Sequence, residues 1–335
     1  MTGNMQVTGR EFAASPMLYP LQLDDDGERM FLARLTEADY RSASFLDERG
    51  LSPAHFVGWA PSALLVRAAE AIRSRPLHFI FHTGHAGSTL LSRLLDQRPG
   101  VLGLREPLPL RTIADAAGRL DALLPPLLRI WARGFADTEA AVVKATSTAG
   151  RLAPQLLATL PMACAIYLYL KAEPTLATMI AGIESVKDQA GFVAERTRRI
   201  TALLGDDSVP QPESPGEFAA LAFLAENLAR AEAQRCGGDR VLALNFEDVL
   251  ADLPGTLARV FAHFGLAMPA GRATDIAAGA VAASYSKAPD QPYSTALRAA
   301  VLDEARQKAG GEIAHGLRWL EAIAARHKAV AVLLT

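Results

Sequence analysis

The segment HTGHAGST, residues 82–89, combines two glycines with the hydroxyls of Ser88 and Thr89. A glycine-rich turn that leads into a helix presents successive backbone N–H groups, which together with the helix N-terminus form a concave site for a phosphate. Gly84 and Gly87 would let the backbone approach the anion, and the two hydroxyls would donate hydrogen bonds to its oxygens. A turn that merely reverses the chain and caps a helix has the same composition, so the motif alone leaves both interpretations open.

The segment lacks the lysine of the nucleoside-triphosphate loop G-x-x-x-x-G-K-[ST]. Because that lysine supports chemistry at the β- and γ-phosphates, an ordinary ATPase or GTPase is disfavoured, and a cradle for a 5′-phosphate group remains. His82 and His85 are a possible metal pair, but no third ligand is spaced to join them. A lone histidine after a buried strand is more often packed than ligating, so we expect no metal.

Strand and helix patterns alternate along the chain on either side of this turn. The strand candidates are near-continuous apolar runs, which indicates a parallel sheet covered by helices on both faces. We predict strands at 77–82, 140–144, 164–170 and 240–245. We predict helices at 88–96, 151–160, 175–184, 217–235, 253–264, 297–308 and 313–328, and loops at 205–216 and 267–293.

The length of 335 residues, at roughly 150 residues per domain, allows one large domain or two modest ones. Residues 1–75 hold helix patterns, for example at 28–35 and 61–73, between glycine and proline signals. We predict a single compact unit in which a P-loop-like α/β domain over 76–335 follows an N-terminal helical extension over 1–75.

The composition is that of a globular protein and carries no strong net charge. Lys and Arg number 34 against 36 Asp and Glu, a net charge of −2, so there is no overall basic field and nucleic acid is not an expected partner. With 50% hydrophobic and 21% charged residues, a disordered chain, a collagen-like chain and a coiled coil are excluded. The two cysteines, Cys164 and Cys236, form neither a metal-spaced pair nor a disulfide framework.

The chain shows no pattern for export or membrane insertion. Residues 1–20 lack a signal-peptide pattern, and the most apolar stretch, 162–183, is interrupted by Lys171, Glu173 and Pro174. It therefore falls short of the roughly 18 apolar residues of a membrane span. We expect a soluble, cytoplasmic protein; the sequence does not indicate its oligomeric state.

Four segments together resemble the sulfotransferase family, which uses 3′-phosphoadenosine-5′-phosphosulfate. FIFHTGHAGSTLLSRLLDQRPGVLGLREPLPLR resembles the family's 5′-phosphosulfate loop, G-x-P-[RK]-S-G-T-[TS], and its helix. AVVKATS is similar to the strand with a second catalytic lysine, NFEDVLADLPGTLARVFAHFGL to the Y-E-D-L block, and SYSKAPDQPYS to the serine–lysine loop that closes over the cofactor. The resemblance spans about 77–295, in order, and is nearest to the protein-tyrosine and carbohydrate branch.

The resemblance implies a set of site residues. Glu106, 21 residues after His85, takes the place of the catalytic glutamate, and Lys144 that of the second catalytic lysine. Ser286 and Lys287 would close over the cofactor. The loop residues that would hold the 5′-phosphosulfate are Thr83, Gly84, His85, Ala86, Gly87, Ser88 and Thr89.

The chain departs from the family pattern at two places. In the loop, His85 replaces the Arg or Lys, Ala86 the following Ser, and Gly84 the Pro. The arginine and serine for the nucleotide 3′-phosphate stand eight residues apart in the family, whereas Lys171 and Thr178, seven apart, are the candidates here.

Sulfuryl transfer requires alignment, a base and charge neutralisation, without a metal. Glu106 is the candidate base, with a salt bridge to Arg105 or Arg111 as the alternative. Lys144 lies on a buried strand and needs an anionic partner, either a carboxylate or, as we favour at this strand end, the transferring group. As an imidazolium, His85 would stabilise the leaving phosphate.

The leading hypothesis is a sulfotransferase that moves a sulfuryl group to a hydroxyl or amine acceptor and releases adenosine 3′,5′-bisphosphate. The alternatives are a P-loop-type kinase or nucleotide hydrolase, and a non-catalytic nucleotide-binding module in which His85 has cost activity. No motif indicates the acceptor.

Overall fold

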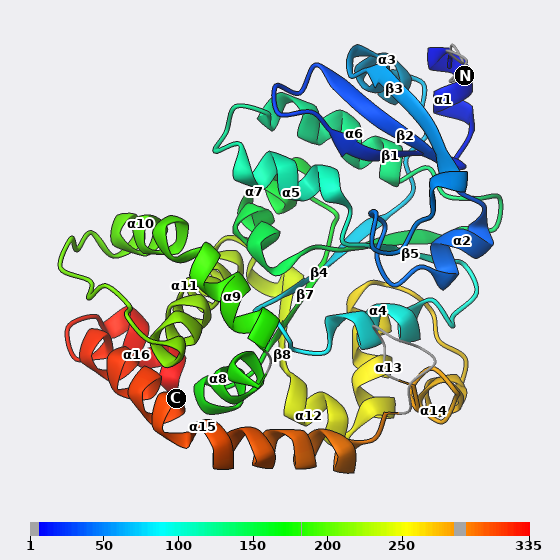
Figure 1. Cartoon of the computed structure of the whole chain (residues 1–335). Helices are drawn as coiled ribbons and strands as arrows, with labels where there is room; N and C mark the ends of the chain where they lie inside the picture. Colours follow the sequence, from blue (N-terminus) through cyan, green and yellow to red (C-terminus); the bar gives the residue numbers. More distant parts are fainter. Residues whose placement is uncertain (1–6, 182, 285–292) are drawn as a thin grey trace.

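A five-stranded parallel sheet forms the centre of the molecule (Figure 1). The structure is a computed structural model that describes residues 7–181, 183–284 and 293–335. The strand order is β5-β6-β4-β7-β8, and each neighbouring pair is parallel. The predicted parallel sheet flanked by helices is therefore confirmed. The strands are β4 (Leu77–His82), β5 (Val101–Arg105), β6 (Ala140–Lys144), β7 (Ala165–Tyr169) and β8 (Val241–Asn245).

Successive side chains of a strand point to opposite faces of the sheet, and the strands here are apolar on both faces. Helices therefore cover both faces. Phe79 and Phe81 of β4 pack with one hydrophobic cluster, and Ile80 between them packs with another. The helices after β4 are α4 (Ser88–Leu95), α5 (Leu108–Asp115), α6 (Leu124–Trp131), α7 (Ala153–Thr159), α8 (Ala172–Ile180), α9 (Ile183–Gly191), α10 (Val193–Leu204), α11 (Pro215–Gly237), α12 (Phe246–Ala251), α13 (Leu253–His263), α14 (Arg272–Ala277), α15 (Thr295–Ala324) and α16 (Lys328–Leu334).

The described part of the N-terminal region contains three α-helices and also a second sheet, which the predicted helical extension did not include. Its three strands are antiparallel in the order β1-β2-β3, and the predicted helix over 28–35 is strand β2. Pairing on both sides satisfies the backbone of β2, and Met30 and Leu32 are buried, so tertiary contacts override the local pattern. The elements are α1 (Gly9–Ala14), β1 (Leu18–Leu23), β2 (Arg29–Arg34), α2 (Glu37–Ser42), β3 (Phe56–Pro61) and α3 (Ala63–Glu70).

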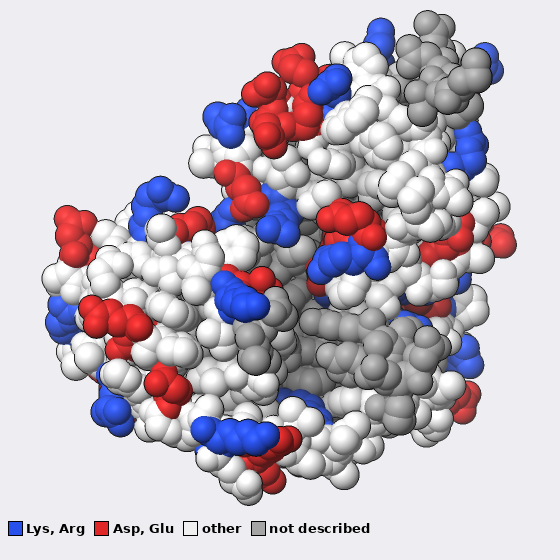
Figure 2. Space-filling view, in the orientation of Figure 1, with Lys and Arg blue, Asp and Glu red and all other residues white. Residues whose placement is uncertain are grey.

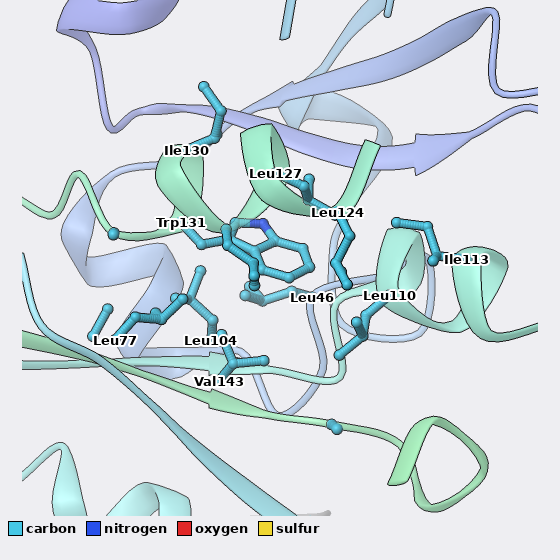
Figure 3. Close-up of a cluster of buried hydrophobic side chains, with 14 of the residues drawn as sticks. Leu46, Leu77, Leu104, Leu110, Ile113, Leu124, Leu127, Ile130, Trp131 and Val143 are labelled. Atoms are coloured by element: carbon cyan, nitrogen blue, oxygen red, sulfur yellow. The ribbon is translucent and has the colours of Figure 1, made fainter. Parts of the chain in front are cut away.

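One hydrophobic cluster joins the N-terminal region to the large sheet. Figure 3 shows Trp131 of α6 surrounded by side chains of this cluster, with Leu104 of β5 and Val143 of β6 beneath it. Leu46, from the segment after α2, lies in the same cluster. The loop that contains Phe45 and Arg49 is therefore anchored against the strands that carry the candidate site.

Several smaller differences separate the predicted from the observed elements. Strand β5 was not predicted, since Gly103 interrupts its short apolar run. Helix α14 lies within the predicted loop 267–293. The two predicted C-terminal helices, 297–308 and 313–328, lie on either side of the kink at Ala309 in the single helix α15, and α16 was not predicted. Among the described residues, no helix is long and apolar enough to cross a membrane.

Candidate active site at the carboxyl edge of the sheet

A cavity of about 310 Å³ opens at the carboxyl ends of β4, β5 and β6. The first strand of the sheet, β4, lies in its middle, with β5 and β6 on one side and β7 and β8 on the other. Open α/β sheets bind ligands at such a switch point, beyond the carboxyl ends of the strands. Figure 2 shows this face hollowed near its centre, with basic and acidic side chains on both sides. The cavity is lined by residues of the turn after β4, by Glu106, and by side chains of α5 and of α8 to α11.

The turn between β4 and α4 has the backbone shape of an anion cradle. Gly84, His85 and Gly87 all have positive φ angles, of 86°, 49° and 70°. Gly87 is the N-cap of α4 and gives the helix no side-chain cap, so the first N–H groups of α4 have no such acceptor. A Cβ at Gly87 would overlap the ring of Phe246, so glycine is required there for space as well as for φ.

The polar side chains of the turn are buried, and two of them have unused hydroxyls. Thr83 and Thr89 are 0% and 2% exposed, and neither Oγ1 has a hydrogen-bond partner among the described residues. Buried hydroxyls are usually satisfied, so these two favour a polar ligand or water at the turn. Ser88 is also buried. Ala86 packs into a hydrophobic cluster and has only its backbone to offer, whereas His85 is exposed and lines the cavity.

Glu106 and Lys144 form a buried ion pair at the ends of β5 and β6. Arg105 is paired with Lys144 across the sheet, and the Glu106 N–H donates to the Lys144 carbonyl oxygen at 2.7 Å. Glu106 has a φ of 52°, which turns the chain into α5 directly after the strand. Lys144 Nζ donates to Oε1 of Glu106, and Arg49 Nη2 donates to Oε2 at 2.9 Å. Glu106 thus receives a cation on each carboxylate oxygen.

The two cations keep Glu106 ionised. Burial alone would raise the pKa of its carboxyl, but the charge of Lys144, that of His82 when it is protonated, and the hydrogen bonds from Lys144 and Arg49 lower it to about 2. Arg49 also binds Asp47, with 2.5 Å between Nη2 and Oδ2, and stacks on Phe45 at 4.1 Å from the ring centroid. Glu106 is therefore an ion-paired carboxylate at neutral pH.

The alternative in which Glu106 pairs with Arg105 or Arg111 is wrong. Consecutive residues of a strand point to opposite sides, and the fully buried Arg105 binds Asp96 on the far side from Glu106. Arg111 lines the cavity, but the carboxylate nearest to it is Asp115, at 3.7 Å. The anionic partner that Lys144 required is the carboxylate of Glu106.

His82 links the turn to the end of β6. Its Nδ1 accepts a hydrogen bond from the Gly84 N–H at 3.1 Å, and its Nε2 lies 3.0 Å from the carbonyl oxygen of Ala145. These partners select the neutral tautomer with its proton on Nε2. Within the described part of the chain, no group of three or more His, Cys, Asp or Glu side chains is placed to hold a metal ion.

The other predicted nucleotide contacts do not line the cavity. Lys171 is exposed at the start of α8, and the Thr178 hydroxyl donates to the Pro174 carbonyl oxygen of its own helix at 2.7 Å. The next residue, Met179, does line the cavity. Ser286 and Lys287 lie outside the described residues.

Several cavity residues were not predicted from the sequence, namely Arg49, Arg111, Gln189, Arg196 and Glu226. Glu226 had a usable signal, because it stands inside the apolar run of α11 and is 1% exposed. A charged residue on a buried helix face indicates a partner or a site. Arg49 had no such signal in the polar segment DERG.

Comparison with known proteins gives structural matches only. No protein-family model matches the chain, and no curated protein matches it. The solved structures that match include sulfotransferase STF9 from Mycobacterium avium, with 11% identity, a TM-score of 0.44 and coverage of 72% of this chain and 78% of that one. Mouse sulfotransferase SULT7A1 complexed with PAP has 13% identity, a TM-score of 0.35 and coverage of 64% and 68%.

Retinol dehydratase in a complex with retinol and PAP has 12% identity, a TM-score of 0.36 and coverage of 89% and 92%. The sulfotransferase resemblance read from the sequence thus has its counterpart among solved structures. Identities of 11 to 13% and TM-scores below 0.5 leave the function to be inferred from the chain's own residues.

Proposed function

We propose that the protein transfers a sulfuryl group from 3′-phosphoadenosine-5′-phosphosulfate to a hydroxyl-bearing acceptor and releases adenosine 3′,5′-bisphosphate. The observation that carries the proposal is that one cavity is lined both by Thr83, Gly84 and His85 of the glycine-rich turn and by Glu106, which is paired with the buried Lys144 behind it. The turn is a site for a phosphate at a helix N-terminus, and the pair supplies a base and a cation beside it.

The turn would hold the 5′-phosphosulfate. The uncapped N–H groups at the start of α4 are the main donors, and the buried hydroxyls of Thr83 and Thr89 have hydrogen bonds to give. His85, exposed at the cavity, takes the place of the loop cation and would neutralise charge on the leaving phosphate when protonated. Ala86 contributes through its backbone N–H alone.

In the proposed reaction the acceptor oxygen attacks the sulfur atom as the bond from sulfur to the 5′-phosphate oxygen breaks. The acceptor proton passes to the Glu106 carboxylate, and the bond electrons leave with the bisphosphate. Lys144 stabilises the sulfuryl oxygens, where negative charge is concentrated in the transition state. The transfer needs little beyond this alignment, because the donor is already activated.

Donor binding and activation of the base are coupled in this proposal. While Lys144 and Arg49 hold Glu106, its pKa of about 2 makes it a weak base. The sulfuryl oxygens compete with the carboxylate for Lys144, and the loss of that partner raises the pKa of Glu106. Glu106 thus becomes a stronger base when the donor is in place.

Recognition of the nucleotide 3′-phosphate by Lys171 and Thr178, and closure by Ser286 and Lys287, remain proposals drawn from the sequence resemblance. Helix α8 begins at the carboxyl end of β7, the neighbour of β4, so Lys171 is at the edge of the sheet where the turn lies. Thr178 would have to give up its hydrogen bond to Pro174 in order to donate to a phosphate.

Calorimetric titration with adenosine 3′,5′-bisphosphate, Mg-ATP and 5′-AMP tests the donor class. Micromolar binding of the bisphosphate with weak binding of the other two supports the proposal. Preference for Mg-ATP would indicate a kinase or nucleotide hydrolase, and no binding of any of them would leave the turn without a nucleotide function.

Glu106→Gln tests catalysis once an acceptor is sulfated. We expect turnover to fall by about 10²- to 10⁴-fold with nucleotide binding retained. Glu139→Gln is the matched control, because Glu139 is 58% exposed and pairs with Arg98 outside the cavity. Equal turnover in Glu106→Gln and the unaltered protein would remove Glu106 from the mechanism.

A further inference from the structure

A second wall of the same cavity comes from α5, α10 and the end of α9. Phe192, between α9 and α10, contacts two guanidinium groups. The Cζ atoms of Arg196 and Arg111 lie 5.2 and 6.0 Å from its ring centroid. Arginine planes stack on aromatic rings while their N–H groups stay available to a ligand. We call Gln189, Phe192, Arg196 and Arg111 the arginine wall.

Arg196 is a buried cation with an unused donor. It is 4% exposed, and its Nη1 donates to Oε1 of Gln189 at 2.6 Å. Its Nε has no hydrogen-bond partner among the described residues. Because Oε1 of Gln189 is taken by Arg196, the amide NH₂ of Gln189 is left as a donor. The arginine wall therefore offers donors to the cavity.

The carboxylates near Arg196 are held more closely by neighbouring arginines than by Arg196 itself. Glu226, 1% exposed, is shared between two guanidinium groups: its Oε1 lies 3.1 Å from Arg199 Nη2 and 3.8 Å from Arg196 Nε. Glu195 also pairs with Arg199, at 3.5 Å, so Arg196 is left with only the longer contact to Glu226. Asp188 lines the cavity as an exposed side chain, where water screens its charge.

Arg111 is a second cation whose charge is only partly neutralised by a neighbouring carboxylate. Its contact with Asp115 is 3.7 Å long, and Asp115 is held more closely by Arg151, at 2.6 Å. The Arg111 side chain is 45% exposed and so is free to turn toward a ligand in the cavity.

We propose that the arginine wall binds a carboxylate of the acceptor, and that the acceptor is a small aromatic hydroxy acid whose hydroxyl faces Glu106. This rests on the proposed sulfuryl transfer. The cavity of about 310 Å³ is at the small end of ligand pockets, and the rings of Phe45 and Phe192 give it apolar sides for a planar acceptor.

Three probes of matched shape test this: 4-hydroxyphenylacetate, its neutral amide 4-hydroxyphenylacetamide, and the cation tyramine. Both kcat/KM with the sulfate donor and Kd for the protein saturated with adenosine 3′,5′-bisphosphate are measured. Charge-assisted hydrogen bonds should favour the acid over the amide by about 10- to 100-fold, with tyramine weakest. An amide or amine that binds as well as the acid, or an acid that does not bind, overturns the proposal.

Substitutions in the arginine wall test whether these residues cause the preference for the acid over the amide. Arg196→Gln and Arg111→Gln should each remove most of the advantage of the acid and leave binding of the amide and of the bisphosphate unchanged. Arg198→Gln is the matched control, since Arg198 is an exposed arginine of α10 that does not line the cavity. If Arg196→Gln does not fold, Arg111→Gln decides alone, and an undiminished preference in it overturns the assignment.

The inference and the proposed function fail in different ways. Sulfation of acid and amide at equal rates would keep the function and reject the arginine wall. Absence of bisphosphate binding and of sulfated product would reject the function. In that case Kd is measured on the protein without nucleotide, and tighter binding of the acid than of the amide, lost in Arg111→Gln, would still support the wall.

Discussion

Glu106 is held between Lys144 and Arg49, and this arrangement decides what the residue can do. A buried carboxylate without partners would have a raised pKa and would destabilise the fold. With a cation on each oxygen, Glu106 is ionised and fixed in position at the edge of the cavity. The pair is a stabilising element of the sheet edge as well as a candidate catalytic pair.

Lys144→Met is expected to destabilise the protein by about 3–5 kcal/mol at pH 7, because it leaves a buried carboxylate with one partner fewer. The folded-state pKa of Glu106 lies below the ordinary value of 4.5, so its contribution is present above pH 4.5 and is lost as the pH falls toward 2. The difference between variant and unaltered protein should therefore shrink as the pH falls below 4.5. Urea unfolding at several pH values measures this difference in the free energy of unfolding.

The double variant Glu106→Gln with Lys144→Met is the control for that experiment. It removes both charges, so we expect it to recover much of the stability lost in Lys144→Met alone. A double variant less stable than Lys144→Met would mean that the pair is not the source of the effect.

At the scale of elements, the anion turn depends on a helix far along the chain. Gly87 is followed at once by α4, yet the atoms that forbid a side chain at Gly87 belong to Phe246, the first residue of α12. The sequence predicts that the turn needs glycine, but not that α12 closes against it. The NFED segment thus supports the turn by packing.

Gly87→Ala is expected to destabilise the protein by about 1–3 kcal/mol and to weaken bisphosphate binding, because the new Cβ displaces Phe246 or the turn. Gly271→Ala is a closely matched control: Gly271 is also a helix N-cap, with a φ of 77°, but nothing lies within 4 Å of its would-be Cβ. Both substitutions place an alanine at a positive φ angle, so both introduce similar backbone strain. Equal losses of stability in chemical denaturation would show that the overlap with Phe246 has no effect.

The sequence predicts elements well where a local pattern and the tertiary environment agree. The apolar runs of β4, β6 and β7 are buried strands in the structure, that of β8 is a partly buried strand, and α11 lies where its pattern predicts. Strand β2 was wrongly predicted as a helix because only its pairing with β1 and β3, which a local pattern does not contain, makes it a strand. At the site, the resemblance proposed Glu106 and Lys144, which the structure places together as an ion pair, whereas no sequence motif pointed to Arg49 or the arginine wall, which line the cavity.

At the scale of the whole molecule, the cavity lies where two hydrophobic clusters meet. One cluster contains Leu46, Leu104 and Leu110. These residues are close in sequence to Phe45, Glu106 and Arg111, so the cluster positions one side of the cavity. The other unites residues of α8, α10, α11, α15 and α16, the helices that carry or support Arg196 and Glu226. The relative position of the two sides therefore depends on how the C-terminal helices pack.

Gly316 of α15 lies at a close approach in that packing. A Cβ there would overlap the backbone of Gly216 in α11 and press on Leu176 of α8, so the three helices approach one another only because this residue has no side chain. Gly316→Ala should push α15 away from α11 and lower the free energy of unfolding by about 1–3 kcal/mol.

The control lies in the same helix. Gly310→Ala has nothing within 4 Å of the new Cβ, and a helical glycine replaced by alanine should gain about 0.5–1 kcal/mol. Since α11 carries Glu226, the shift in Gly316→Ala should also reduce binding of 4-hydroxyphenylacetate relative to Gly310→Ala. If both variants unfold at the same urea concentration, the contact of α15 with α11 does not set the position of the cavity wall, and the wall must be held by α8 to α10 instead.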